Sequence, residues 1–188
     1  MDRRTLLGAM LAAPLVPLAP ALVRPAAAQT DFDVPFVTTP QNVVDAMLEL
    51  GGVGPDDTLI DLGSGDGRIV LTAAKRWGTK GVGYEIDPRL VSNAQRAARR
   101  EGVDHLARFV VEDIFVADLS AATVITMYLL PDVNLRLLPR LRRLRPGTRL
   151  VSHDWDMGDW APQRTIEVDA PEKRVGFRKT SRLMLWTV

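Results

Sequence analysis

The segment Thr58–Arg68, with the sequence TLIDLGSGDGR, constrains the fold of this 188-residue chain more than any other part of it. An apolar run followed by closely spaced glycines predicts a buried strand, a tight turn and the start of a helix, because glycine permits backbone conformations that side chains disfavour. The glycines also let the backbone approach a ligand closely, and Asp61 places a carboxylate where the strand ends. The segment therefore predicts one wall of a ligand site.

A second apolar segment, Gly81–Asp87, ends in acidic residues, and an acid at this point can accept hydrogen bonds from both hydroxyls of a ribose. The turn departs from the dinucleotide fingerprint G-x-G-x-x-G/A, because Arg68 stands in place of the third glycine. Asp61 and Asp66 would also repel a pyrophosphate at short range. The spacing therefore favours a cationic ligand over a dinucleotide, with an ordinary tight turn as the alternative.

The order of strand, D-x-G-x-G-x-G turn, helix, strand and acid resembles motif I of the class I S-adenosylmethionine-dependent methyltransferases. Their cofactor, S-adenosyl-L-methionine, carries a sulfonium and an ammonium, which suits an acidic turn. The resemblance implies ten cofactor-binding residues: Asp61, Gly63, Ser64, Gly65, Asp66, Gly67, Glu85, Ile86, Asp113 and Ile114. Glu85 would hold the ribose and Asp113 the adenine amino group. The residues alone leave alternatives, since Asp113 can cap a helix, Asp61 can anchor turn amides, and Ile86 and Ile114 can belong to the core.

Apolar and amphipathic stretches alternate along the rest of the chain. They predict helices over 41–50, 67–77, 88–101 and 133–144, and strands over 58–62, 81–86, 107–111, 122–127, 148–153, 164–169 and 183–187. The alternation predicts an α/β fold with a doubly wound, mostly parallel sheet, and two trailing strands without a helix between them predict an antiparallel C-terminal edge. This is also the Rossmann-like layout that the class I methyltransferase resemblance implies.

The N-terminal residues 1–28 have the pattern of a twin-arginine signal peptide. Arg3 and Arg4 precede a weakly apolar stretch, and small residues end at Ala28, where we expect cleavage. The methyltransferase domain would then comprise residues 29–188, in the periplasm or cell envelope if the leader functions and in the cytoplasm otherwise. Pro14, Pro17 and Pro20, which interrupt the apolar stretch of the leader, argue against a membrane-spanning helix, and an uncleaved interfacial anchor is the alternative.

Composition excludes several kinds of site. The chain has no cysteine and two histidines, which excludes cysteine chemistry, zinc–thiolate sites and a histidine-rich metal site, so no metal is predicted. The formal net charge is +1. The leader contributes a net +2 through three arginines and one aspartate, so the mature chain is close to neutral and its bulk charge indicates no particular partner. A monomer is expected.

Three further segments, 36–40, 123–131 and 146–160, resemble bacterial relatives of the mitochondrial protein-lysine methyltransferases that modify the ATP synthase c-subunit and the adenine nucleotide translocase. The resemblance implies N-methylation of a lysine in a protein partner, which can be a membrane protein. One departure is that a secretion-type leader stands where the mitochondrial members carry a targeting and membrane segment, which leaves the substrate open. The alternatives are a small-molecule or RNA methyltransferase, and a binding module without catalysis.

Tyr128, His153 and Asp154 are the candidate catalytic residues, because they follow predicted strands whose carboxyl ends meet at one edge of the sheet. A lysine nucleophile must be neutral, and desolvation between aromatic walls such as Tyr128, Trp155 and Trp160 lowers its pKa. His153 or Asp154 could take the proton. The alternatives are that the aromatic residues fill the end of the sheet and that His153 is a structural, hydrogen-bonded residue.

Two further features bear on a nucleic-acid partner. The predicted strand that ends before Tyr128 lacks the Asn/Asp-Pro-Pro-Tyr run that class I enzymes use on exocyclic amines, which disfavours a nucleobase substrate. The predicted helix over 133–144 is rich in arginine. It is interpreted as a solvated helix face, with an anionic surface or RNA as the alternative.

Overall fold

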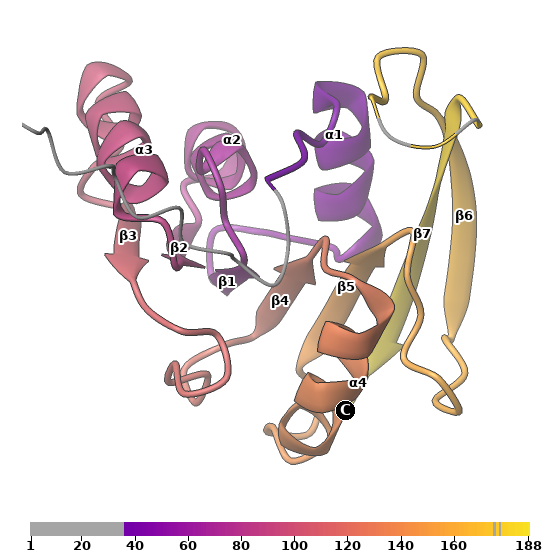
Figure 1. The fold of residues 1–188 in the computed structure, drawn as a ribbon. Helices are drawn as coiled ribbons and strands as arrows, with labels where there is room; N and C mark the ends of the chain where they lie inside the picture. The colour runs from indigo at the N-terminus through magenta and orange to yellow at the C-terminus, as the bar shows by residue number, and fades with distance from the viewer. Residues whose placement is uncertain (1–35, 175, 177) are drawn as a thin grey trace, which may run out of the picture. The chain divides into compact units, whose positions relative to one another are not determined.

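A seven-stranded sheet organises the part of the chain that the computed structural model describes, residues 36–188 except 175 and 177 (Figure 1). The predicted signal peptide lies outside the described residues. The strands are β1 (Thr58–Leu62), β2 (Lys80–Glu85), β3 (Ala107–Val111), β4 (Val124–Met127), β5 (Arg149–His153), β6 (Arg164–Asp169) and β7 (Thr180–Thr187). The helices are α1 (Gln41–Leu50), α2 (Arg68–Trp77), α3 (Pro88–Arg100) and α4 (Pro131–Leu141).

The strand order is β3-β2-β1-β4-β5-β7-β6. The first five strands in sequence pair in parallel, whereas β7 pairs antiparallel with both β5 and β6. The predicted doubly wound sheet with an antiparallel C-terminal edge is confirmed. The chain runs outward from β1 to β3 and then returns to place β4 on the other side of β1, so the order reverses between β1 and β4. Ligands of such sheets bind at the carboxyl ends of the strands beside this reversal.

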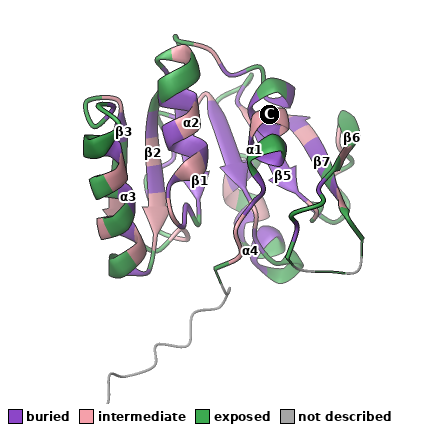
Figure 2. Ribbon diagram, turned by 90° about the horizontal axis from the view of Figure 1, so that it is seen from above, coloured by how far each residue is buried: buried purple, intermediate pink, exposed green. Residues whose placement is uncertain are grey.

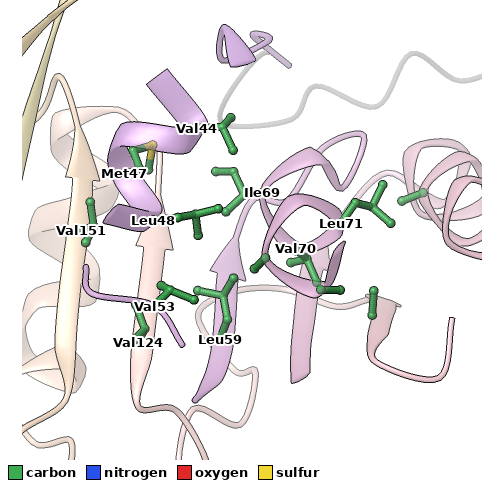
Figure 3. Packing of buried hydrophobic residues seen from close by; sticks show 14 of the residues in the cluster. Val44, Met47, Leu48, Val53, Leu59, Ile69, Val70, Leu71, Val124 and Val151 are labelled. Carbon is green, nitrogen blue, oxygen red and sulfur yellow. The ribbon is translucent and has the colours of Figure 1, made fainter. Parts of the chain in front are cut away.

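Helices cover both faces of the sheet, with α1, α2 and α3 on one face and α4 on the other (Figure 1). Alternation along β1 divides the core, because successive side chains of a strand point to opposite faces. Leu59 belongs to the cluster that includes Val44 and Leu48 of α1, and it lies beside Leu48 in Figure 3. Ile60 and Leu62 belong to the cluster on the α4 face. The buried surfaces of the helices face the sheet, and their exposed surfaces face outward (Figure 2).

Several element boundaries differ from the predictions by a few residues. Helix α4 begins at Pro131. Proline is tolerated at the first helical position, because an amide hydrogen there would have no partner within the helix. Helix α2 begins after Gly67, whose φ of 82° is left-handed and therefore not helical. Strand β7 extends back to Thr180, where pairing with β6 continues its ladder. None of the helices in the described part of the chain has the length and hydropathy to cross a membrane.

Candidate active site

The glycine turn after β1 is fixed by hydrogen bonds to the neighbouring strand. The amides of Gly63 and Ser64 both donate to the carbonyl oxygen of Tyr84, at 3.0 and 2.9 Å. Gly65 adopts a φ of 54°, and a Cβ atom there would overlap the ring of Phe36. Ser64 Oγ is buried and finds no hydrogen-bond partner among the described residues. The turn is therefore a cradle that admits no side chain at Gly65, with the half-exposed Phe36 ring against it.

Glu85 joins the end of β2 to this turn. One of its carboxylate oxygens accepts a hydrogen bond from the Gly65 amide at 2.9 Å, and the other accepts from the amides of Ile86 and Asp87 at 2.8 and 3.0 Å. These contacts fix the carboxylate at the sheet edge, and its remaining lone pairs can accept hydrogen bonds from ligand hydroxyls. The structure thus brings together the glycine turn and the acid predicted to hold a ribose.

Asp61 is a buried carboxyl group at the switch between β1 and β4. It is 3% exposed and accepts a 2.7 Å hydrogen bond from the Thr126 hydroxyl. Burial raises the pKa of Asp61 to about 7, the Thr126 hydrogen bond opposes this shift, and the carboxylates of Glu85 and Asp66 add to it. A cationic ligand in the crevice would favour the ionised form. The protonation state of Asp61 is therefore coupled to ligand charge.

Asp66 is less available to a ligand than its place in the turn suggested. Its carboxylate oxygens accept hydrogen bonds from the Arg68 guanidinium at 2.9 and 3.1 Å from Nε, and Arg68 also donates to the carbonyl oxygen of Thr39. This pairing partly offsets the charge of Asp66, although its carboxylate still helps to raise the pKa of Asp61. The assignment of Asp66 to the cofactor stays a prediction.

The residues predicted to hold the adenine lie at the end of the sheet beyond β2 and β3. Ile86 is 45% exposed and is therefore not a core residue. Its side chain is accessible, as contact with an adenine ring requires. Ile114 is partly buried against the cluster on the α4 face. Asp113 accepts a 2.9 Å hydrogen bond from the Phe115 amide, so it fixes the turn that follows β3. Only Oδ1 of this exposed carboxylate accepts from the Phe115 amide. The role of Asp113 in the turn therefore does not preclude a contact between Oδ2 and the adenine.

Tyr128 and Asp154 meet at the carboxyl ends of β4 and β5. The Tyr128 ring stacks on the His153 ring with centroids 3.8 Å apart, and its hydroxyl donates to Asp154 Oδ2 at 3.4 Å. Burial first, and Asp154 second, raise the pKa of Tyr128 to about 12. Asp154 has a φ of 64°, a left-handed conformation that is uncommon outside glycine. Its amide donates to the Arg182 carbonyl oxygen on β7, which helps to hold this conformation.

His153 is fully buried beneath Tyr128. Its Nε2 lies 2.8 Å from Ser181 Oγ, and its Nδ1 lies 3.5 Å from Thr39 Oγ1. Burial lowers the pKa of His153 to about 4; Asp154 opposes this shift and Lys173 adds to it. The imidazole is therefore neutral near pH 7, and neither nitrogen is exposed. The structure supports the structural alternative for His153, as a support for Tyr128, and its role as a base stays a prediction.

The two tryptophans proposed as pocket walls have different environments. Trp155 is 40% exposed, and its carbonyl oxygen accepts hydrogen bonds from Ser152 Oγ at 2.5 Å and from the buried Asn134 Nδ2 at 3.3 Å. Trp155 therefore lies on a fixed loop directly after Asp154 and is exposed to solvent. Trp160 instead packs against the core residue Trp186, with ring centroids 6.3 Å apart. Of the two, only Trp155 is exposed beside the candidate site.

Lys173 is a member of this site that the sequence did not indicate. Its ammonium lies 2.6 Å from Asp154 Oδ2 and donates to the Thr180 carbonyl oxygen at 2.8 Å, and the residue is 9% exposed. Lys173 belongs to the β6–β7 connection, which the sequence shows only as a polar, basic loop. No local pattern could have identified it, because its partner is supplied by the end of β5.

Two arginines, one in α4 and one in the segment after it, bind the backbone of the connection between β3 and β4. Arg140 donates to the carbonyl oxygens of Ile114, Phe115 and Ala117, and Arg145 donates to that of Ala121. These contacts fasten the connection between β3 and β4 to α4. Arg140 and Arg145 are therefore engaged within the protein, and the interpretation of the helix as a solvated face, with an anionic partner as the alternative, stays a prediction.

Comparison with known proteins places this geometry in a family. The sequence model of the ANTKMT methyltransferase domain matches residues 61–164, which run from Asp61 to the first residue of β6. The chain belongs to the ANTKMT methyltransferase domain family. It is an S-adenosylmethionine-dependent methyltransferase, as the resemblance carried by the glycine turn and Glu85 implied.

Individual relatives agree with this assignment. A protein-lysine N-methyltransferase of Saccharolobus islandicus is 45% identical over 138 residues, covering 72% of this chain and 86% of the relative. The lysine N-methyltransferase of the ATP synthase c-subunit from Xenopus laevis is 34% identical over 131 residues, covering 69% of this chain and 55% of the relative. The crystal structure of an RNA methyltransferase from Salinibacter ruber in complex with S-adenosyl-L-homocysteine has a TM-score of 0.74 and 50% identity, and the alignment covers 81% of this chain and 94% of that one.

The crevice of this ANTKMT-family chain fits S-adenosylmethionine on its own observations. The turn at Gly65 leaves no room for a side chain, the buried Asp61 has a raised pKa that a cation would relieve, and Glu85 is fixed at the sheet edge. The exposed Ile86 offers an apolar surface next to Glu85. Asp61 would hold the methionine moiety, Glu85 the ribose and Ile86 the adenine, along the ends of β1 and β2.

Proposed function

We propose that this methyltransferase transfers a methyl group to the side-chain amine of a lysine in a protein substrate. The observation that carries the proposal is the Tyr128–Asp154 pair beside the exposed Trp155, at the strand ends next to the cofactor turn. The Saccharolobus and Xenopus relatives, which are protein-lysine methyltransferases by name, support the same reaction.

The chemistry requires alignment and a neutral amine. When bound, S-adenosylmethionine supplies a methyl group on a sulfonium, and displacement requires the nucleophile, the methyl carbon and the sulfur to be in line. Lowering the pKa of a lysine from about 10.4 to about 7 requires about 5 kcal/mol of differential stabilisation. Desolvation against aromatic surfaces supplies such shifts, and Trp155 and Tyr128 provide those surfaces here.

Tyr128 is suited to orient the amine. Because its pKa is raised to about 12, the phenol is neutral in the physiological range. Its proton is directed toward Asp154 Oδ2, so the lone pairs of its oxygen remain to accept an N–H from the incoming amine. The imidazole of His153 holds the ring in place from behind. An accepted hydrogen bond of this kind aims the nitrogen lone pair without supplying a charge that would keep the amine protonated.

The test is a labelling experiment on the full chain. The protein is incubated with a methyl-labelled cofactor and either cell extract or membrane fraction, and labelled products are separated into protein, RNA and small molecules. Methyl-lysine in protein hydrolysates supports the proposal, and Tyr128→Phe should reduce it while cofactor affinity, measured by calorimetry, is retained. Label confined to RNA would overturn the proposal in favour of the activity named for the Salinibacter ruber protein. Binding without any labelled product would favour a module without catalysis.

We also propose that the leader exports the protein, that it acts as a metal-free monomer, and that its substrate is a membrane protein. The paired Arg3 and Arg4 and the small residues before Gln29 support export, and the Xenopus relative's named target supports a membrane protein. Fractionation of cells expressing the wild type and the Arg3→Lys/Arg4→Lys variant tests export, since only the wild type should reach the envelope. Sedimentation tests the monomer and a chelator control tests metal independence. Label in the membrane fraction tests the class of substrate.

A further inference from the structure

The ion pair between Lys173 and Asp154 is buried beside the proposed lysine site. Their side chains are only 10% and 17% exposed, and the ammonium and the carboxylate lie 2.6 Å apart. The same carboxylate oxygen, Oδ2, also accepts the Tyr128 hydroxyl at 3.4 Å. Asp154 Oδ2 therefore contacts both the Tyr128 hydroxyl, which is proposed to accept a hydrogen bond from the substrate amine, and the ammonium of Lys173.

An uncompensated carboxylate at this position would work against the reaction. A negative charge within a few ångströms stabilises an ammonium and raises its pKa by about 1–3 units. A bound substrate lysine would then remain protonated, and a protonated amine has no lone pair with which to attack the methyl group. The site needs the carboxylate to orient Tyr128 without its charge acting on the substrate.

We propose that Lys173 is a positioning residue that offsets the charge of Asp154, so that a bound substrate lysine can lose its proton. This inference rests on the proposed function. The second hydrogen bond of the ammonium, to the Thr180 carbonyl oxygen, keeps the cation in place when substrate binds. The substrate lysine would then lie next to an ion pair without net charge, Lys173–Asp154, and next to the neutral phenol of Tyr128.

The other titratable and charged groups that pack around the pair do not replace this function. His153 of β5 is neutral near pH 7, and Tyr128 after β4 is a phenol. Arg182 of β7 donates to the Asp154 carbonyl oxygen and pairs with Asp156, and Lys179 donates to the Lys173 carbonyl oxygen. The Lys173 ammonium also contributes to lowering the pKa of the neighbouring His153.

A cycle of charge variants tests the inference, with the labelled acceptor protein from the experiment above as substrate. The pH dependence of kcat at saturating substrate reports the titration of the bound amine. Lys173→Met should move the acidic limb of this profile to higher pH by about one unit or more, a tenfold loss of kcat on that limb. Lys173→Arg should restore the limb, and Asp154→Asn alone should not raise it. The double variant Lys173→Met/Asp154→Asn, again neutral overall, should return the limb close to that of the wild type.

Two controls make the result decisive. Lys80→Met removes an exposed lysine at the start of β2 and should leave the profile unchanged. NMR titration of the two histidines reads the local charge without substrate: Lys173→Met should raise the pKa of His153, with exposed His105 as an internal reference. An unshifted kcat limb or an unshifted His153 in folded Lys173→Met would overturn the inference while leaving the proposed function intact. If the wild type labels no lysine at all, the proposed function fails and the inference with it.

Discussion

Substitution of Asp61 by asparagine should weaken cofactor binding and remove most of its pH dependence below pH 7. In the free protein the pKa of Asp61 is raised from 3.8 to about 7, chiefly by burial. A bound sulfonium and ammonium favour the carboxylate, so the pKa of Asp61 falls when the cofactor binds. At pH 6 only about one Asp61 in ten is ionised beforehand, so the affinity should be about tenfold lower than at pH 8, with nearly one proton released for each cofactor bound.

The same shift predicts a gain in stability for the ligand-free Asp61→Asn variant. Because the folded protein binds this proton more tightly than the unfolded chain, stability is greater at low pH and is lost as the pH rises from about 4 through about 7. A shift of about 3 units at 1.36 kcal/mol each corresponds to about 4 kcal/mol as an upper bound. Asparagine carries no charge and can still accept the hydrogen bond from Thr126. The variant should therefore unfold at higher denaturant concentration than the wild type at pH 8.

Calorimetry between pH 5.5 and pH 8.5, in two buffers of different ionisation enthalpy, measures both affinity and proton release. The difference between wild type and Asp61→Asn isolates Asp61, because any titration of the cofactor's own amine is common to both. Asp104→Asn, at an exposed loop carboxylate, is the matched control and should behave as the wild type. Equal pH dependence in Asp61→Asn and the wild type, or a lower stability of the ligand-free variant at pH 8, would refute the reasoning.

Four further substitutions give measurable outcomes. Gly78 has a φ of 71°, and a Cβ atom there would meet nothing within 4 Å, so Gly78→Ala should cost about 1–2 kcal/mol of unfolding free energy through backbone strain alone. Gly67→Ala should cost about 1–3 kcal/mol more than Gly78→Ala, because its Cβ atom would lie 2.6 Å from the Phe109 ring. Equal urea midpoints for the two variants would contradict this. Tyr128→Phe should lower kcat at least tenfold with little change in cofactor affinity, by analogy with the loss of one positioned hydrogen bond, and an unchanged kcat would remove Tyr128 from the mechanism. Asn134→Leu should increase proteolysis or hydrogen exchange in the loop after β5, because the carbonyl oxygens of that loop lose their buried donor, and unchanged protection would count against the clamp.

The sequence determined those features that depend on local chain conformation. The spacing of Gly63, Gly65 and Gly67 after an apolar strand predicted the turn, because only residues without a Cβ adopt those dihedral angles in so little space. Glu85 was identifiable because it stands at a fixed distance along a strand–helix–strand unit. The alternation of strands and helices predicted the sheet, including its antiparallel edge, since period and length identify each element separately.

Only the tertiary structure decided which partners the charged and aromatic side chains have. Lys173 meets Asp154, Arg140 meets the backbone beyond β3, and His153 lies buried under Tyr128, in each case across elements that are distant in sequence. Trp155 and Trp160 are both tryptophans of the same short segment, yet Trp155 is exposed to solvent and Trp160 packs on Trp186. A sequence pattern gives the conformation of a segment, whereas the charge state and exposure of a side chain depend on what the rest of the fold brings within a few ångströms of it.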